Sequence, residues 1–229
     1  MNLTPTKHEP CFYTGVFNNK ELYFLRQVDD FAIACEDEQM AKDFIATIST
    51  KLSIEIKYLG LLQRFNGVDI DQTSEYIKIH CTTYIDKILS EHDWFDHASP
   101  CHTFPIPIKS ENSYSRKLET ATVPSTTREG FALQREMKFN YRQAIGALIY
   151  AMVTCRPDIS FPLIKLSQYS SNPAKEHYEA VQDIFKYLSC TKTDGIQYWR
   201  CSPISNLPAH QETFDMETTL NETTIQDLP

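Results

Sequence analysis

Two adjacent aspartates, Asp29 and Asp30, lie between two short apolar runs. Both runs are rich in β-branched and aromatic residues, which predicts a pair of buried strands. Because successive strand residues point to opposite faces, neighbouring carboxylates can serve one site only at a tight turn. Two carboxylates on such a turn suit a magnesium ion used in phosphoryl transfer. Exposed turns also use Asp routinely, since its side chain bonds its own backbone, so the pair alone leaves a plain solvated turn open.

The residues after this turn predict a helix and then two more strands. Apolar residues recur four apart over residues 38–52, as on one face of a helix. Residues 65–70 and 76–79 predict two strands around a polar turn. Thr82 or Thr83 then caps a short helix. The predicted order is therefore strand, Asp-Asp turn, strand, helix, two strands and helix.

The second half of the chain has helical periodicity. Asn140 caps one helix, Pro157 suits the first turn of the next, and Asn172 begins another. The first of these helices is predicted to bury an apolar face made of Tyr141, Ile145, Leu148, Ile149, Met152 and Val153. Upstream, residues 99–138 contain several prolines among many Ser and Thr, which predicts a connection without regular elements.

Six short motifs follow one another along the chain. They are Gln27-Val28-Asp29-Asp30, Leu59-Gly60 with Phe65 to Ile70, Tyr84 to Leu89, Tyr141 to Tyr150, Thr154 to Ile159, and Ser171 to Leu188. In this order they resemble characteristic segments of the reverse transcriptases of Ty1/copia-class LTR retrotransposons. The resemblance covers roughly residues 9 to 200.

The resemblance implies an α+β fold in which a partial palm precedes a helical region. Residues 1–98 are the expected partial palm, an antiparallel sheet with helices that carries the Asp-Asp hairpin, and residues 99–138 are the connection. Residues 139–195 are the expected helices of the thumb and connection. Residues 196–229 are expected to be a truncated strand and a disordered acidic tail, because no Lys or Arg follows Arg200.

The same resemblance implies an RNA-directed DNA polymerase with a two-metal nucleotidyl-transfer site. Asp29 and Asp30 would be the catalytic carboxylates and would hold Mg2+, or Mn2+ in its place. Gln27 and Val28 would lie in the nucleotide pocket. Its partners in the intact enzyme would be an RNA template, a DNA primer, a dNTP and other Pol-derived segments.

Two further sets of residues have expected roles near the nucleic acid. Phe65 and Gly67 lie where relatives position the primer end, although a strand with a bulge is the alternative. The helical region offers four cations that could contact a nucleic-acid duplex, namely Arg142, Lys165, Lys175 and Lys186. A solvated helix face is the commoner role of such cations, and it stays open.

The chain departs from the family pattern in two places. Gln27 stands where the family has Tyr, and no Asp precedes Asp29 although the family carries a third catalytic Asp upstream. We therefore expect this chain to be incomplete and inactive alone, because two metals need more ligands than one Asp-Asp turn offers. The alternative is a decayed retroelement product that acts at most as a non-catalytic module binding nucleic acid or protein.

Composition limits the other possibilities. The net charge of −8 disfavours tight binding to a phosphate backbone. The chain has no apolar stretch of about 18 residues and no signal peptide, so no membrane segment is expected. Seven cysteines without paired spacing favour free thiols and a cytoplasmic location. Four possible zinc ligands lack the usual paired spacing, namely His92, His97, Cys101 and His102.

Overall fold

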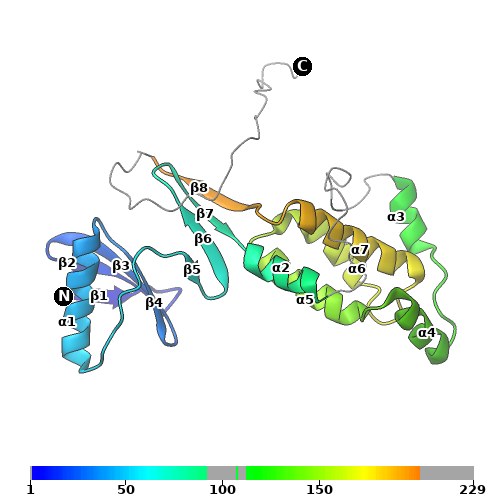
Figure 1. Cartoon of the computed structure of the whole chain (residues 1–229), viewed down its shortest axis with the longest axis horizontal. Coiled ribbons are helices and arrows are strands. Elements are labelled where there is room, and N and C mark those ends of the chain that lie inside the picture. The colour runs from blue at the N-terminus through cyan, green and yellow to red at the C-terminus, as the bar shows by residue number, and fades with distance from the viewer. Residues whose placement is uncertain (1, 92–106, 108–111, 202–229) are drawn as a thin grey trace, which may run out of the picture.

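The computed structural model describes residues 2–91, 107 and 112–201 of the chain (Figure 1). It contains two antiparallel four-stranded sheets and a helical bundle. In Figure 1 the first sheet lies at one end of the molecule, the bundle lies at the other, and the second sheet lies between them. This combination of antiparallel sheets and helices confirms the predicted α+β class.

The first sheet is a meander whose strands are neighbours in sequence order. Its strands are β1 (Asn2–Pro5), β2 (Phe12–Phe17), β3 (Lys20–Gln27) and β4 (Asp30–Ala34). The helix α1 (Glu38–Leu52) has the predicted bounds and begins where the Asp37 carboxylate accepts the Met40 N–H at 2.8 Å. Phe44 of α1 packs against Phe17 and Phe24, so the helix covers one face of the sheet.

The sequence prediction for this sheet was wrong in two respects. The strands on either side of the aspartates are not fully buried, because α1 covers only one face and Leu22 is the sole buried residue of β3 and β4. The strands β1 and β2 were not predicted. They supply the partners on one side of β3, so β4 forms an edge of the sheet.

The second sheet joins segments that are far apart in sequence. Its strands are β5 (Arg64–Phe65), β6 (Val68–Gln72), β7 (Tyr76–His80) and β8 (Gly195–Trp199). The strand β8 follows the whole helical bundle and pairs with β7. A Cβ atom at Gly195 would overlap the carbonyl oxygen of Ile79, so this close pairing requires glycine. The predicted strand at residues 196–199 is present and completes this sheet.

The helical bundle contains six α-helices and a short 3-10 turn in the described residues. They are α2 (Thr82–Ser90), α3 (Asn112–Glu119), α4 (Thr127–Met137), α5 (Tyr141–Thr154), η2 (Pro157–Ile159), α6 (Ser160–Ser167) and α7 (Lys175–Cys190). The bundle encloses the larger hydrophobic core, which includes Ile85, Leu118, Leu148, Leu163 and Phe185. None of the described helices is both long and apolar enough to cross a membrane.

Several details of the helices differ from the prediction. The helices α3 and α4 lie within residues 99–138, where prolines led us to expect no regular element. On α5, Val153 is 69% exposed and Ile149 is 39% exposed, because the helix buries its Ala144 side instead. The N-cap of α7 is Ala174, two residues after the predicted one.

The start of α2 also differs from the predicted threonine cap. Its N-cap is Cys81, whose side chain makes no capping hydrogen bond. The carboxylate of Asp69 on β6 performs this role, accepting the backbone N–H and the hydroxyl of Thr83 at 2.8 and 2.9 Å. The second sheet is therefore bonded directly to the first turn of the bundle.

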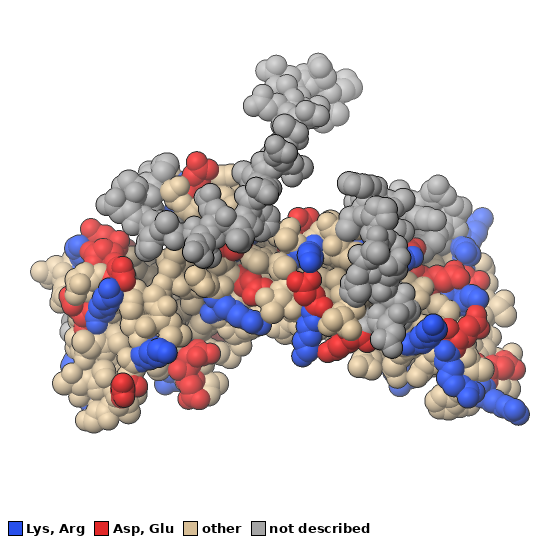
Figure 2. Space-filling view, viewed as in Figure 1, with Lys and Arg blue, Asp and Glu red and all other residues tan. Residues whose placement is uncertain are grey.

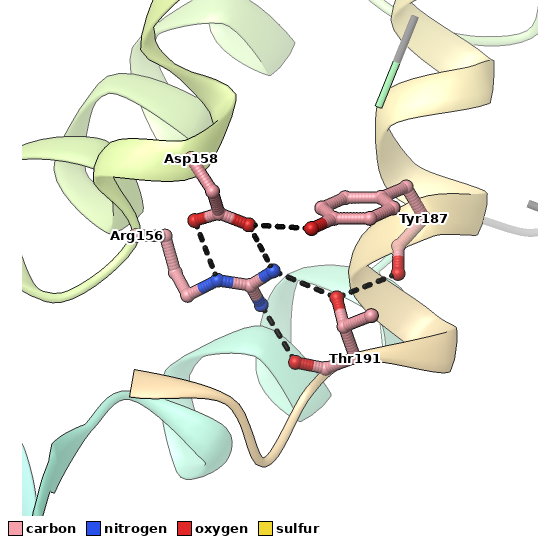
Figure 3. Close-up of polar contacts among 4 residues, drawn as sticks. All are labelled: Arg156, Asp158, Tyr187 and Thr191. Carbon is pink, nitrogen blue, oxygen red and sulfur yellow. Dashed lines mark hydrogen bonds and ion pairs between the residues drawn. The ribbon is translucent and has the colours of Figure 1, made fainter. Parts of the chain in front are cut away.

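Charged side chains of both signs are interspersed over the face of the molecule in Figure 2. Among the described residues, one charged group lies inside. Arg156 is 1% exposed and donates to both carboxylate oxygens of Asp158, at 3.0 and 2.6 Å (Figure 3). It also donates to the carbonyl and the hydroxyl of Thr191, both at 2.7 Å, while the Tyr187 hydroxyl donates to Asp158. Since Thr191 ends α7, this cluster ties the turn after α5 to the turn that leads into β8.

Candidate active site

The two aspartates lie at the tip of the β3–β4 hairpin. Gln27 pairs with Asp30 at the end of the ladder, so Val28 and Asp29 are the two residues of the turn. The structure thus confirms a tight turn between two strands. All four residues are exposed, and Val28 is 81% exposed. The turn brings Gln27, Val28, Asp29 and Asp30 together in one open position.

The backbone at Val28 is strained. Its φ is 53°, in the left-handed region that glycine and asparagine adopt readily and that a β-branched residue disfavours. Such a conformation costs on the order of 1–2 kcal/mol. Burial of the Val28 side chain does not offset this cost, because the side chain lies almost entirely in solvent. Strain of this kind often occurs at functional positions.

The carboxylates of Asp29 and Asp30 are not engaged within the described part of the chain. No hydrogen bond or ion pair joins either of them to another described residue. By contrast, Asp37 in the same unit is paired with Lys20 at 3.3 Å. The hydrogen bond from Met40, followed by that from Lys20, lowers the pKa of Asp37. The two hairpin carboxylates are therefore open to an external cation.

These two oxygen donors fit part of a magnesium shell and are too few for two metals. Mg2+ favours carboxylate and water oxygens in octahedral geometry, and a site with two ions needs further protein ligands. Among residues 2–91, 107 and 112–201, no group of three His, Cys, Asp or Glu side chains could hold a metal ion. The predicted alternative zinc ligands, His92, His97, Cys101 and His102, lie outside the described residues.

Phe65 and Gly67 lie at a second hairpin. Phe65 ends β5 and pairs with Val68, and the turn between them has positive φ at Asn66 (50°) and Gly67 (81°). This two-residue loop matches the twist of antiparallel strands, and Asn-Gly is its favoured sequence. A Cβ atom at Gly67 would lie 2.9 Å from the Tyr150 hydroxyl, so the turn presses closely on α5.

The contact with α5 is reinforced by aromatic packing. The ring of Tyr84 on α2 lies 4.4 Å from that of Tyr150, and the Tyr84 hydroxyl donates to the carbonyl of Ala147 at 3.0 Å. The second hairpin is therefore seated on the helical bundle. In Figure 1, β5 lies between the first sheet and α2.

The four cations predicted to contact nucleic acid all have partners inside the molecule. Arg142 donates to the carbonyl of Ser170 at 2.8 Å. The three lysines pair with carboxylates, as Lys165 with Glu119 at 2.6 Å, Lys175 with Glu136 at 2.7 Å, and Lys186 with Asp183 at 3.1 Å. This arrangement is compatible with a solvated helix face, and their role in nucleic-acid binding stays a prediction.

Sequence reasoning missed a set of cations on α4 and at its end. Arg128, Arg135 and the C-cap Lys138 are exposed, and none forms an ion pair with another described residue. The signal for the first two was present in the sequence, because a spacing of seven residues places Arg128 and Arg135 on one side of a helix. It was overlooked since residues 99–138 were predicted to contain no helix.

The chain is similar in sequence to reverse transcriptases and to Pol polyproteins of transposons. Residues 1–109 match the family model described as reverse transcriptase (RNA-dependent DNA polymerase). The chain is 32% identical over 204 residues to the retrovirus-related Pol polyprotein from transposon TNT 1-94 of Nicotiana tabacum, a match that covers 87% of this chain. It is 28% identical over 176 residues to the Pol polyprotein from transposon RE1 of Arabidopsis thaliana, covering 76% of this chain.

A third relative is the putative transposon Ty5-1 protein of Saccharomyces cerevisiae, which is 28% identical over 178 residues and matches 77% of this chain. The matches span 14% of the tobacco polyprotein, 11% of the Arabidopsis one and 52% of the yeast protein. No solved structure matches the chain significantly.

Proposed function

Because the chain is a reverse-transcriptase-like segment related to the Pol polyproteins of copia-type retrotransposons, we propose that its Asp-Asp hairpin is part of the nucleotidyl-transfer site of an RNA-directed DNA polymerase. The observation that carries the proposal is the hairpin tip, where two unpaired carboxylates meet at a strained two-residue turn. Neither burial nor an internal contact accounts for this arrangement.

In the proposed site Asp29 is the main ligand of Mg2+ or Mn2+, and Asp30 assists it. The bound ion would activate the primer 3′-hydroxyl and stabilise the leaving pyrophosphate. Gln27 and Val28 border the nucleotide on the same turn. The Phe65–Gly67 turn positions the primer end, and its seat on Tyr150 supports this role because a positioning element needs a rigid backing.

A further palm segment has to complete this site. Two carboxylates do not supply the ligands of a two-metal centre, so a third is proposed to come from another Pol-derived segment. The strand β4 supports this view, since it is an edge strand and nothing in the described residues pairs with its outer side. An unpaired apolar edge strand is a ready template for another strand.

The second candidate is a decayed product that binds nucleic acid or protein without catalysis. One observation favours it, namely that Gln27 stands where the family has Tyr. The two candidates differ in what happens when the missing segment is supplied in trans. A polymerase segment regains metal-dependent extension, whereas a non-catalytic module does not.

The test is primer extension on an RNA template with Mg2+ or Mn2+. We expect no extension by this chain alone, and template-dependent extension when an upstream palm segment of a related polyprotein is added. Asp29→Asn should abolish that extension. The matched control is Asp43→Asn, an equal change on the exposed side of α1. If the chain alone extends the primer and Asp29→Asn abolishes that extension, the expectation that the chain is incomplete is wrong. If no extension occurs even after the palm segment is added, the non-catalytic candidate is favoured.

A further inference from the structure

We propose that His80 is the centre of a pH-sensitive latch, which holds the return of β8 to the second sheet more firmly when the imidazole ring is protonated. The latch consists of Asp71 on β6, His80 at the end of β7, Thr82 at the start of α2 and the backbone carbonyl of Lys192 before β8. We call these four groups the His80 latch. They are distinct from the residues of the proposed active site.

His80 lies where three strands and a helix meet. It is 9% exposed, and it pairs with Asp69 of β6 on one side and with Gly195 of β8 on the other. A Cβ atom at Gly195 would lie 2.8 Å from the Cβ atom of His80, so β8 begins directly against this residue. The first residue of α2, Thr82, follows two positions later. The contacts of the His80 ring therefore bear on how β8 and α2 are held to the sheet.

The hydrogen bonds of Thr82 determine which ring nitrogen carries a proton. The Thr82 hydroxyl donates its single proton to the carbonyl of Lys192 at 2.9 Å, since a carbonyl oxygen can only accept. The same hydroxyl oxygen lies 2.7 Å from Nδ1 of His80 and has to act as the acceptor there. Nδ1 is therefore protonated, and in the neutral ring Nε2 has a lone pair and no proton.

Nε2 of His80 is placed to take up a second proton. This atom is buried and has no hydrogen-bond partner in the part of the chain that the structure describes, yet it lies 3.2 Å from Oδ2 of Asp71. In the neutral ring the lone pair of Nε2 lies against a carboxylate, which is unfavourable. In the imidazolium both nitrogens are donors, so Nε2 pairs with Asp71 while Nδ1 keeps its bond to Thr82. Protonation thus joins β6 through His80 and Thr82 to the turn before β8.

Other charged groups of these segments are largely engaged elsewhere. The carboxylate of Asp69 accepts two hydrogen bonds from Thr83, and the Lys192 ammonium pairs with Asp86 at 3.0 Å. Among the described carboxylates, only that of Asp71 forms an ion pair with the ring. The charged residues around the latch on β5 to β7, on α2 and in the turn before β8 are Arg64, Asp69, Lys78, Asp86, Lys192 and Asp194.

The direction of the effect follows from these contacts. Histidine side chains gain their charge as the pH falls from about 8 to about 5, so the latch should form over this range and be lost as the pH rises again. The Asp71 side chain is 33% exposed, so water weakens its attraction to the ring. We therefore expect the local opening of β8 to become about two- to fivefold rarer at the acid end, as for a partly exposed ion pair.

The experiment follows hydrogen exchange of the full chain by NMR between about pH 8 and pH 5.5, with correction for the intrinsic exchange rates. The measured quantity is the protection of amides 195–199 of β8 divided by that of amides 178–188 of α7. This ratio removes any pH dependence that the whole bundle has. It should rise about two- to fivefold as the pH falls, and a ratio that stays constant or decreases would contradict the proposal.

Two variants and a matched control assign the effect to the latch. His80→Gln removes the titrating ring and Asp71→Asn removes its charged partner, so each should make the ratio independent of pH. The control Asp86→Asn removes an equal charge from the neighbouring pair with Lys192 and should keep the pH dependence. If Asp71→Asn retains the full pH dependence, another group is responsible and the proposal is wrong. Circular dichroism checks that every variant is folded.

The ring nitrogens of the unmodified chain provide a test that needs no variant. Their NMR chemical shifts should show a proton on Nδ1 alone at about pH 8 and protons on both nitrogens at the acid end. If the neutral ring carries its proton on Nε2, that proton already serves Asp71, and the proposal fails. This readout keeps the proposal testable even if His80→Gln does not fold.

Discussion

At the scale of single residues, His177 shows how a buried titratable side chain is held neutral. Its Nδ1 accepts the backbone N–H of Ala174 at 3.0 Å, and its Nε2 donates to the carbonyl of Leu118 at 2.8 Å. The ring also stacks on Tyr169 with centroids 3.8 Å apart. Burial lowers the pKa of His177, because the charged form is poorly solvated there.

This environment predicts acid sensitivity of the bundle. The folded pKa lies below the unfolded value of about 6.5, so the unfolded chain takes up the proton first as the pH falls. Stability should be full above about pH 6.5 and decline below it, by at most about 1.4 kcal/mol per pH unit until the folded pKa is reached. Urea unfolding between about pH 7 and pH 5 measures how the free energy of unfolding depends on pH. If the His177→Gln variant loses stability with the same slope against pH, another group is responsible.

The strained turn residue gives a second prediction at this scale. Val28→Asn should raise the free energy of unfolding by about 0.5–1 kcal/mol, because asparagine tolerates the left-handed backbone and Val28 loses no packing. Thermal unfolding tests this, with Val16→Asn as a control on an exposed strand position of ordinary φ. A lower melting temperature for Val28→Asn than for the unmodified chain would show that the turn is not strained as described.

The sequence predicted the place of the two aspartates and not their surroundings. Two short apolar runs were enough to locate a turn at Asp29 and Asp30, since strand pairing is local there. The left-handed φ of Val28 could not be predicted, because no sequence rule places valine in that region. The partners of Lys165 and Lys175 depend on carboxylates that are distant in sequence, so composition alone could not reveal them.

At the scale of elements, helices and strands that depend on local sequence signals were predicted better than features that depend on residues distant in sequence. Residues 38–52 form the predicted helix because a capping Asp and a four-residue apolar spacing agree. The helix α4 was missed because Pro124 was taken to interrupt structure, although it precedes the N-cap Thr126. On α5 apolar residues occur all round, so periodicity could not decide that Val153 faces solvent.

The second hairpin yields a prediction at this scale. Gly67→Ala should lower the free energy of unfolding by about 1–3 kcal/mol, since it adds a Cβ at φ 81° and 2.9 Å from the Tyr150 hydroxyl. Tyr150→Phe removes that oxygen and should recover at least about 0.5 kcal/mol in the double variant. Chemical denaturation of the four proteins measures the coupling, and strict additivity would mean that the turn and α5 do not touch.

At the scale of the whole molecule, two hydrophobic cores of unequal size contribute unequally to the free energy of unfolding. The first sheet and α1 share a core with four buried residues, namely Phe17, Leu22, Met40 and Phe44. The bundle has a much larger core, to which Val68 and Ile79 of the second sheet also contribute. Hydrophobic burial is the main stabilising contribution, so the bundle should be the more stable unit.

Hydrogen exchange tests this division. Amides of residues 22–34 should exchange well before those of residues 142–188, because local unfolding of the first sheet exposes little apolar area. Amides of β7 and β8 should follow the bundle, since Asp69 of β6 bonds the second sheet to α2 and the Arg156 cluster holds the turn that leads into β8. Equal strong protection of the first sheet and the bundle in a monomer would show that the first sheet is complete enough to be stable without further strands.

The chain leaves the second sheet after His80 of β7 and re-enters it at Gly195 of β8. Because β7 and β8 pair with each other, residues 81–194 form a single closed loop between them. A cut in the backbone between α2 and α3 would therefore yield two pieces, each holding one strand of the same ladder. We expect them to co-elute as one particle after limited proteolysis and to reassemble after denaturation. Topologically, the helical bundle is an insertion between neighbouring strands, and fragment complementation would reveal it.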